Sequence, residues 1–355
     1  MQKCKLSLIV CTYMRPEPLS RLLKSVMSQS QVPDEVLIID GSTDDKTELL
    51  FQDSSEFRIQ SSELDSSTLH SSSSSSSSSK LRYFQVPAEH RGLTKQRNYG
   101  IERVGSDIDI VAFLDDDTLL DPDYFKQLID TYTQFPNAIG VGGYITNEVS
   151  WEPTETEDKN DLNYFYYDGY RRKESSRYIL RRKLGLAQQT PPAVYPEFGH
   201  GRSVSFLPPS GKIYQVEQLM GGVSSFPLSV LKEHKFSEYF EGYGLYEDAD
   251  FTLRLSHIGD LYVNTAAQLE HHHDAAGRPN KYAYGKMVVR NGWYVWRVRH
   301  PKPSFKNKLK WYQITLLLTA IRFLNIFTTR ERKEAFTEAI GRSVGIISLL
   351  FNKPK

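Results

Sequence analysis

Short apolar runs alternate with amphipathic segments along the first half of the chain. Residues 5–12 and 36–39 are apolar enough for buried strands, and the segment between them repeats its large aliphatic residues at helical spacing. Those aliphatic residues are Leu19, Leu22, Leu23 and Val26. Strand, helix and strand in this order predict the start of a parallel sheet with a right-handed crossover. Further strands are predicted at residues 81–86, 108–114 and 139–145. Helices are predicted after a cap at Thr94, from Pro122 and at residues 247–255.

Two stretches depart from this pattern. Residues 53–80 are rich in serine and include nine consecutive serines at 71–79. Such a run cannot bury enough surface to offset its ordering entropy, so we expect a disordered insertion within the domain. Residues 151–183 are polar, aromatic and weakly periodic, which predicts an exposed excursion.

The C-terminal part, residues 276–355, is predicted to be a helical extension of a domain that covers residues 1–275. Within it, residues 311–327 are strongly apolar but interrupted by Arg322 and Asn325, and lysines precede them. The run is slightly short for a membrane-spanning helix, and a central Arg is costly in lipid. Two arrangements stay open: an interfacial helix with a basic collar, in peripheral contact with a membrane, and a helix packed on the protein's own core.

Overall composition narrows the class of protein. The chain has 355 residues, 39% of them hydrophobic, and a net charge of +1, so bulk charge does not indicate a nucleic-acid partner. Cys4 and Cys11 lie on one predicted strand, too far apart to bond, which favours a reducing, cytoplasmic setting. Only a strand-length apolar run follows Lys3 and Lys5, so no signal peptide is expected.

Three carboxylates follow the apolar run 108–114 directly: Asp115, Asp116 and Asp117. Side chains alternate along a strand, so Asp115 and Asp117 are expected on one side of the chain. Two carboxylates at the end of a strand suit Mg²⁺ or Mn²⁺, which complete their shells with phosphate and water. The alternative is a polar turn that caps the helix starting near Pro122.

A second acidic group opens the predicted helix 247–255, with Glu247, Asp248 and Asp250 in its first turn. Neighbouring helical residues point about 100° apart, so only one of Glu247 and Asp248 can face a given substrate. The exposed N–H groups of a first turn favour an ionised carboxylate, which can take a proton from a hydroxyl group. Capping of the helix is the alternative interpretation.

Five motifs in this order resemble the family-2 glycosyltransferases, nucleotide-sugar enzymes with the GT-A fold. The motifs are Ser7–Tyr13 with Arg15-Pro16, Ile39–Asp44, Gly92–Asn98, Leu114–Asp117 and Tyr246–Phe251. The resemblance covers roughly residues 5 to 275 and is closest to enzymes of bacterial surface-polysaccharide assembly. It implies an α/β protein with the Rossmann-like GT-A fold, in which helices flank a mixed, mostly parallel central sheet.

The resemblance also implies roles for single residues at the nucleotide. Thr12, Tyr13 and Arg15 would lie by the base and ribose, and Asp40 would accept hydrogen bonds from the base. Arg97 would face the diphosphate. Asp115 and Asp116 complete the implied nucleotide-binding set.

For the metal and the chemistry, the resemblance implies Asp117 as the principal ligand of Mn²⁺ or Mg²⁺, with Asp115 beside it. His271 and His273 lie where a late metal-binding histidine would fall, although a run of histidines is otherwise an ordinary solvated loop. Asp248 would be the general base of an inverting displacement, oriented by Glu247.

Two positions depart from the family pattern. Many relatives carry two acidic residues where this chain has Ile39-Asp40, so a single carboxylate is present at the position implied in base recognition. Gln96 replaces the small residue often found before the Arg-Asn pair.

We therefore expect an inverting glycosyltransferase that moves a sugar from a nucleotide-diphosphate donor to a carbohydrate or lipid-linked sugar acceptor, in polysaccharide or glycolipid assembly. It is expected in the cytoplasm, peripherally on the inner face of a membrane. One alternative is a non-catalytic protein that binds a nucleotide sugar within an assembly complex. Another is a sugar nucleotidyltransferase, which would show a glycine-rich phosphate loop after its first strand; this chain has Thr12–Pro16 there.

Overall fold

The computed structural model describes residues 4–52, 79–158, 160–240, 243–273 and 280–354. The chain divides into two compact units, each assembled from three segments. The first unit contains residues 1–146, 220–244 and 266–274; the second contains residues 147–219, 245–265 and 275–355. The predicted serine-rich insertion lies outside the described residues, except for Ser79 and Lys80.

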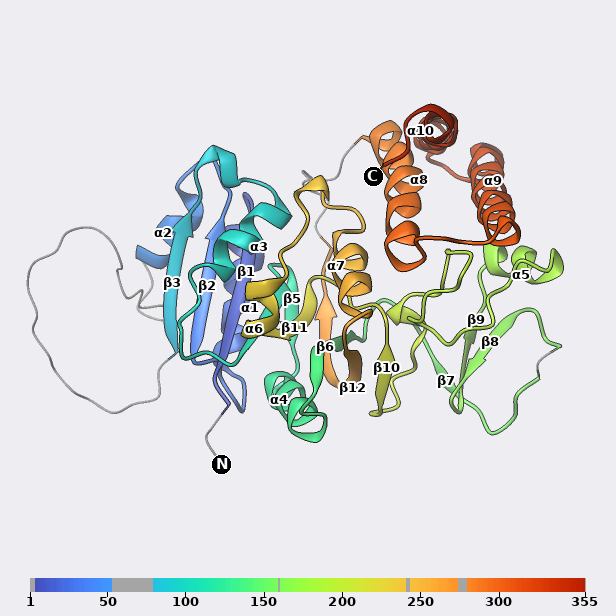
Figure 1. Ribbon diagram of the computed structural model, residues 1–355. Coiled ribbons are helices and arrows are strands. Elements are labelled where there is room, and N and C mark those ends of the chain that lie inside the picture. Colours follow the sequence, from blue (N-terminus) through green and yellow to red (C-terminus); the bar gives the residue numbers. More distant parts are fainter. Residues whose placement is uncertain (1–3, 53–78, 159, 241–242, 274–279, 355) are drawn as a thin grey trace, which may run out of the picture. The chain divides into compact units, whose positions relative to one another are not determined.

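The first unit is built on a mixed, mostly parallel sheet (Figure 1). Its parallel part has the order β3-β2-β1-β4, and β11 then pairs antiparallel with both β4 and β6. The end of β12 follows β6 and pairs antiparallel with the short strand β5. The strands are β1 (Leu6–Thr12), β2 (Glu35–Asp40), β3 (Lys80–Gln85), β4 (Ile110–Asp115), β5 (Thr118–Leu120), β6 (Ala138–Ile145), β11 (Val223–Pro227) and β12 (Asp260–His271).

The central strands are buried along almost their whole length. Every residue of β2 is buried, as are the aliphatic residues of β1 and most of β4. A parallel strand covered on both faces reads as a continuous apolar run, which is why these strands are visible in the sequence.

Helices of the first unit mostly follow the predicted periodicity. They are α1 (Pro16–Met27), α2 (Lys46–Gln52), α3 (Leu93–Ile101), α4 (Tyr124–Gln134) and α6 (Leu228–Glu233), with short 3₁₀ turns at Ala88–His90 and Glu238–Phe240. Helix α1 begins at a proline and buries the four aliphatic residues predicted for its inner face. The prediction that Thr94 caps α3 is wrong: Gly92, at φ 116°, precedes the helix, and Thr94 is buried in its first turn. A positive φ at that point suits glycine.

The second unit contains a small antiparallel sheet with the order β7-β9-β8 and helix α5. These elements are β7 (Glu152–Pro153), β8 (Tyr164–Tyr167), β9 (Tyr170–Lys173) and α5 (Ser176–Lys183). The stretch 151–183, expected as an exposed excursion, thus carries regular structure and buries Tyr178 and Arg181. The unit also holds a 3₁₀ turn at Val204–Phe206, helix α7 (Glu247–Leu255) and β10 (Ile213–Val216), which pairs with the beginning of β12.

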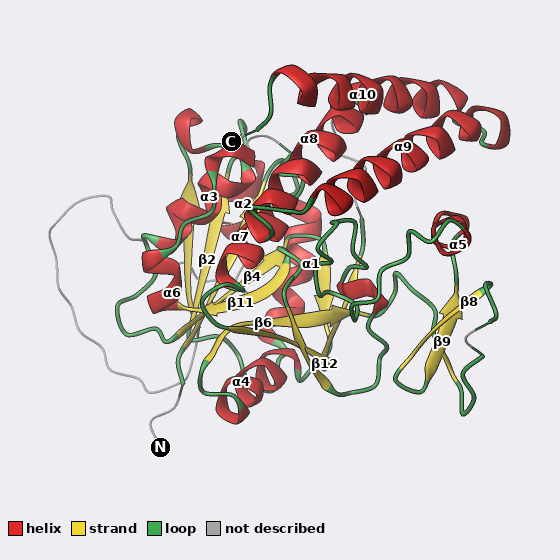
Figure 2. Ribbon diagram, turned by 45° about the vertical axis from the view of Figure 1, so that its right-hand side comes forward, coloured by secondary structure: helices red, strands yellow, loops and turns green. Residues whose placement is uncertain are grey.

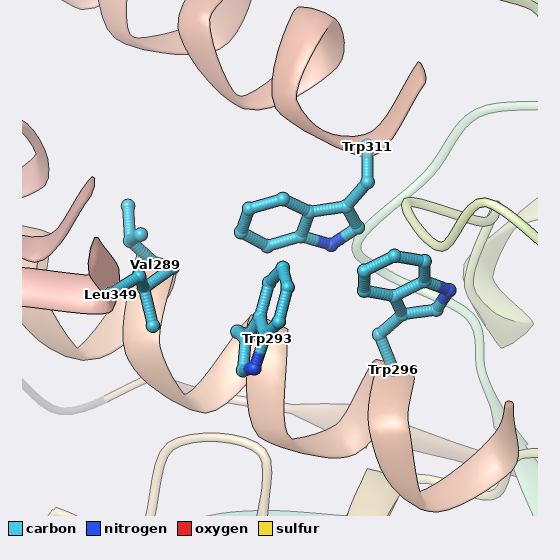
Figure 3. Close-up of a cluster of buried hydrophobic side chains, with 5 residues drawn as sticks. All are labelled: Val289, Trp293, Trp296, Trp311 and Leu349. Carbon is cyan, nitrogen blue, oxygen red and sulfur yellow. The ribbon is translucent and has the colours of Figure 1, made fainter. Parts of the chain in front are cut away.

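Three long helices complete the second unit: α8 (Lys281–Arg299), α9 (Phe305–Thr328) and α10 (Arg332–Phe351). A cluster of Val289, Trp293, Trp296, Trp311 and Leu349 forms their common core (Figure 3). The indole rings of Trp296 and Trp311 stack, with centroids 5.5 Å apart and planes 8° from parallel. No helix in the described part of the chain is long and apolar enough to cross a membrane.

Candidate functional site

The acidic turn between β4 and β5 lies at the carboxyl edge of the parallel strands of the first unit. Its three carboxylates differ in exposure: the side chains of Asp116 and Asp117 are almost fully buried, and that of Asp115 is 41% exposed. Buried carboxylates need partners, because an unpaired buried charge is costly. Those partners define what each aspartate can do.

Asp116 is held by residues of the first strand and the turn after it. The Thr12 hydroxyl donates to Oδ2 of Asp116 at 2.6 Å, and the Arg15 guanidinium donates to Oδ1 at 3.1 Å. Burial raises the pKa of Asp116 to about 6, although the hydrogen bond from Thr12 and the charge of Arg15 oppose that shift. Asp116, Thr12 and Arg15 therefore fix the shape of the acidic turn.

Asp117 lies between a cation and an imidazole. Its Oδ2 is 3.3 Å from the Arg15 guanidinium, and its Oδ1 is 3.0 Å from Nε2 of His271. His271 reaches this place because β12 pairs with β5, with His271 opposite Thr118, and the His272 amide donates to the Asp117 carbonyl at 2.9 Å. The structure thus brings together two predicted ligands from distant parts of the sequence.

These contacts bring possible metal-ligating atoms close together. One atom each of Asp115, Asp117 and His271 lie within 4.8 Å of one another. Two carboxylates and an imidazole fit Mn²⁺, and the carboxylates alone fit Mg²⁺. The ring of His273 packs on that of His271, with centroids 4.0 Å apart.

Arg97 supplies a fixed positive charge next to this set. It is buried in the middle of α3, where its guanidinium lies over the rings of Phe113 and Phe236. One of its terminal nitrogens is 4.0 Å from Oδ1 of Asp115. A buried guanidinium held by aromatic rings keeps its position when an anion arrives, which suits the predicted role at the diphosphate.

Gly222 is a part of the site that the sequence did not indicate. A Cβ atom at this position would stand 2.1 Å from Cγ and Oδ2 of Asp115. The amide of Asp115 also donates to the Gly222 carbonyl at 3.2 Å. Only glycine leaves room for the observed Asp115 carboxylate, so Gly222 sets the position of a candidate ligand.

Asp40 is fully buried at the end of β2, and both of its carboxylate oxygens accept hydrogen bonds within the protein. Oδ1 accepts from the amide and the hydroxyl of Ser42, and Oδ2 accepts from the hydroxyl of Tyr83 at 2.8 Å. Ser42 in turn accepts from the amide of Met14, which has φ 58°. Asp40 thus organises the loops after β1 and β2, and its contact with a nucleotide base stays a prediction.

Tyr13, beside that loop, has a half-exposed side chain, with 52% of its surface accessible.

Gln96, a departure from the family pattern, is buried in α3. Its amide nitrogen donates to the carbonyls of Thr12 at 3.1 Å and Ile39 at 2.7 Å. The glutamine therefore ties together the carboxyl ends of the two strands that carry Thr12 and Asp40.

The second acidic group lies in the second unit, at the start of α7. Tyr246 precedes the helix in a left-handed conformation, and Glu247, Asp248 and Asp250 occupy its first turn, as predicted. Asp250 is fully buried, and its Oδ2 pairs with Arg254 at 3.0 Å; burial raises the pKa of Asp250, against the charge of Arg254. Glu247 is buried as well, whereas Asp248 is partly exposed. Asp248 is therefore the carboxylate of this turn that is best placed to reach a ligand.

Comparison with known proteins agrees with this picture. Residues 7–188 match the family described as glycosyl transferase family 2. A protein of Haloferax volcanii, named glucosyl-dolichyl phosphate glucuronosyltransferase, is 33% identical over 147 residues, which make up 40% of this chain and 38% of that protein. The chain thus aligns with well under half the length of that relative.

A solved structure has the same fold. Mannosyltransferase PcManGT from Pyrobaculum calidifontis, in complex with GDP-Man and Mn²⁺, superposes with a TM-score of 0.53 and 11% identity. The match covers 100% of this chain and 89% of that one, and it confirms the predicted GT-A architecture.

Proposed function

Because the chain belongs to glycosyl transferase family 2, we propose that it is an inverting glycosyltransferase, which moves a sugar from a nucleotide-diphosphate donor to an acceptor hydroxyl. The observation that carries the proposal is the cluster of Asp115, Asp117 and His271 beside Arg97, at the carboxyl edge of the sheet. Ligands of open α/β sheets bind at this edge.

The donor would bind with its diphosphate at this cluster. Asp117, Asp115 and His271 would hold Mn²⁺ or Mg²⁺, which when bound neutralises charge on the leaving diphosphate. Arg97 adds a second positive charge, whose guanidinium would not have to move when the diphosphate binds. The nucleoside would lie against residues on or near the ends of β1 and β2: Thr12, Tyr13, Arg15 and Asp40.

Asp248 would act on the acceptor. It takes the proton from the acceptor hydroxyl, whose oxygen forms a bond to the anomeric carbon of the donor sugar. The bond from that carbon to the diphosphate oxygen breaks, and the nucleotide leaves with the electron pair. A single displacement of this kind inverts the anomeric centre. The N–H groups at the start of α7 favour a negative charge at Asp248, and Glu247 would orient its carboxylate.

A lipid-linked sugar is the acceptor class that we favour. The support is the similarity to a protein named for a glucosyl-dolichyl phosphate substrate. Such an acceptor belongs to glycolipid or polysaccharide assembly, and it offers a free sugar hydroxyl together with a phosphate and an apolar tail.

The test is a panel of nucleotide sugars with Mn²⁺, screened first by thermal shift and then for transfer to polyprenyl-phosphate sugars. A donor at 100 times its dissociation constant should stabilise the fold by about 2.7 kcal/mol. Asp117→Ala should abolish transfer and remove the Mn²⁺ dependence of donor binding, while Asp130→Ala, on the exposed face of α4, should change neither. Tight binding of a donor by wild type without transfer to any acceptor would instead favour a non-catalytic binding protein.

A further inference from the structure

Helix α9 carries an exposed apolar stripe along its whole length. The stripe contains Phe305, Leu309, Leu316, Leu324 and Phe327, whose exposed fractions are 81%, 49%, 54%, 62% and 78%. At about 100° per residue these positions fall within one third of the helix circumference, and they extend over roughly 33 Å. Soluble proteins seldom expose a continuous apolar surface of this kind without a partner.

The opposite face of α9 is fixed on the second unit. Trp311 stacks on Trp296 of α8, and Ile314 packs on Leu186 and Phe198. Arg322 donates to the buried carboxylate of Glu338 in α10. These contacts hold the helix in one rotational position, so that its outward stripe is a set feature of the fold.

Helix α10 lies beside α9 and exposes apolar residues of its own (Figure 2). These residues are Phe336, Ile347, Leu350 and Phe351. The last of them is 86% exposed. Both neighbouring helices thus carry exposed apolar residues.

Exposed cations lie at both ends of α9. Lys302, Lys306 and Lys308 are exposed at its start. Where the chain passes into α10, the three exposed cations Arg330, Arg332 and Lys333 outnumber the two exposed carboxylates Glu331 and Glu334. This arrangement argues against a second copy of the chain as the partner of the stripe. If two stripes packed together in either direction, one cationic end would face another.

A pocket of about 510 Å³ lies beside the start of the stripe. Arg297, Lys308 and Lys353 line it together with Trp293, Tyr294 and Tyr312, and none of its lining residues among the described part of the chain is acidic. Three cations and aromatic walls suit an anionic group such as a phosphate. Lys308 precedes Leu309 of the stripe, so the anion site and the apolar surface adjoin.

We propose that α9 and α10 lie flat on a bilayer that contains anionic lipid, with the stripe at the boundary of the acyl chains and a lipid phosphate in the pocket. A bilayer offers apolar surface and anionic headgroups side by side, as this surface requires. The proposal does not depend on the proposed catalytic roles, because neither the stripe nor the pocket includes any of those residues.

Co-sedimentation of the full chain with vesicles tests it. Binding is expected to vesicles of phosphatidylcholine with 30% phosphatidylglycerol at low salt, and to weaken in high salt. Leu316→Gln with Phe327→Gln should weaken binding at least tenfold, whereas the matched pair Leu184→Gln with Ile258→Gln, also exposed apolar residues of the second unit, should not. Vesicle binding should weaken about fivefold for each lysine changed to Gln among Lys302, Lys306 and Lys308. The control changes to Gln, at Lys173, Lys183 and Lys232, should weaken vesicle binding by much less.

Three outcomes would overturn the proposal. The first is no sedimentation with anionic vesicles at low salt. The second is equal binding to pure phosphatidylcholine, which removes the role of the cations. The third is a dimer in light scattering that dissociates in the Leu316→Gln, Phe327→Gln variant, which assigns the stripe to a second copy. Transfer from a soluble donor is measured in parallel without vesicles, so a failure of the catalytic proposal is seen separately.

Discussion

Gly222 lies against the carboxylate of Asp115, so close that a Cβ on it would stand 2.1 Å from Cγ of the aspartate. Asp115 is the last residue of β4, and Gly222 directly precedes β11, the antiparallel neighbour of β4. The absence of a side chain at position 222 thus decides where a candidate metal ligand can point.

The first prediction follows from that contact. Gly222→Ala should turn the Asp115 carboxylate away, because the aspartate is partly exposed and has room to rotate. We expect Mn²⁺ affinity in the presence of nucleotide to fall at least tenfold, with little change in melting temperature. Calorimetric titration measures this. Gly292→Ala is the control, because nothing lies within 4 Å of a Cβ at that position of α8; equal Mn²⁺ affinity in both variants would contradict the prediction.

A second prediction separates binding from chemistry. Asp248→Asn keeps the size of the side chain but cannot accept a proton, so donor affinity should stay nearly constant while the rate of transfer falls roughly 10² to 10⁴-fold. Steady-state kinetics at saturating donor and acceptor measure the loss. Near-wild-type turnover would exclude Asp248 as the base. Asp250 would then be the next candidate, although its pairing with Arg254 makes it less accessible.

The third prediction concerns Gln96, whose amide donates to two buried carbonyls. Gln96→Ala, which restores a small side chain of the kind many relatives carry, should remove both donors. Because the Thr12 carbonyl keeps the Gly41 amide as a donor at 2.9 Å, we expect the free energy of unfolding to fall by about 1 to 3 kcal/mol. Urea denaturation measures it. Gln134→Ala, at the exposed end of α4, should be nearly neutral. A loss below about 0.5 kcal/mol for Gln96→Ala would mean that water or a rearranged backbone replaces the amide.

The fourth prediction is a pH dependence of stability. Burial lowers the pKa of His200 to about 3, and nearby Arg181 acts in the same direction. Its Nε2 lies 2.9 Å from the Thr315 hydroxyl, which itself donates to the Trp311 carbonyl, so the ring serves as a neutral donor. The unfolded chain protonates this histidine below about pH 6.5, but the folded chain does not until about pH 3. Stability contributed by neutral His200 is therefore complete above pH 6.5 and is lost as the pH falls.

Between pH 6.5 and 5 this effect should cost about 2 kcal/mol of unfolding free energy. His200→Asn tolerates the positive φ of 56° and removes the titration. Urea denaturation of both proteins at several pH values compares the slopes. Equal slopes for wild type and variant would show that His200 titrates alike in the folded and unfolded chain.

The sequence pattern predicted those elements whose burial is determined by their own residues. Strand β2 is apolar because it is buried on both faces, and helix α1 repeats its aliphatic residues at helical spacing because it buries one face. The acidic turn was visible because it follows a buried strand directly. The start of α3 was misassigned because Thr94 looks like a cap, whereas the chain uses the backbone freedom of Gly92 and buries the threonine.

Contacts that depend on register between distant strands could not be read from the sequence. Tyr83 reaches Asp40, and Gly222 faces Asp115, only because of how β3, β2, β4 and β11 align. His271 was placed through family resemblance, and its pairing opposite Thr118 explains why it reaches Asp117. Residues 151–183 concealed a small sheet because its tyrosines and arginines pack on one another without an aliphatic core.

The tryptophan cluster gives the two units different optical signatures. All four tryptophans of the chain, Trp151, Trp293, Trp296 and Trp311, belong to the second unit. Tryptophan emission therefore reports the unfolding of that unit, while tyrosine and far-ultraviolet signals report both. Coincident denaturation curves would show that the two units unfold as one cooperative system, and separated curves would give each unit its own stability.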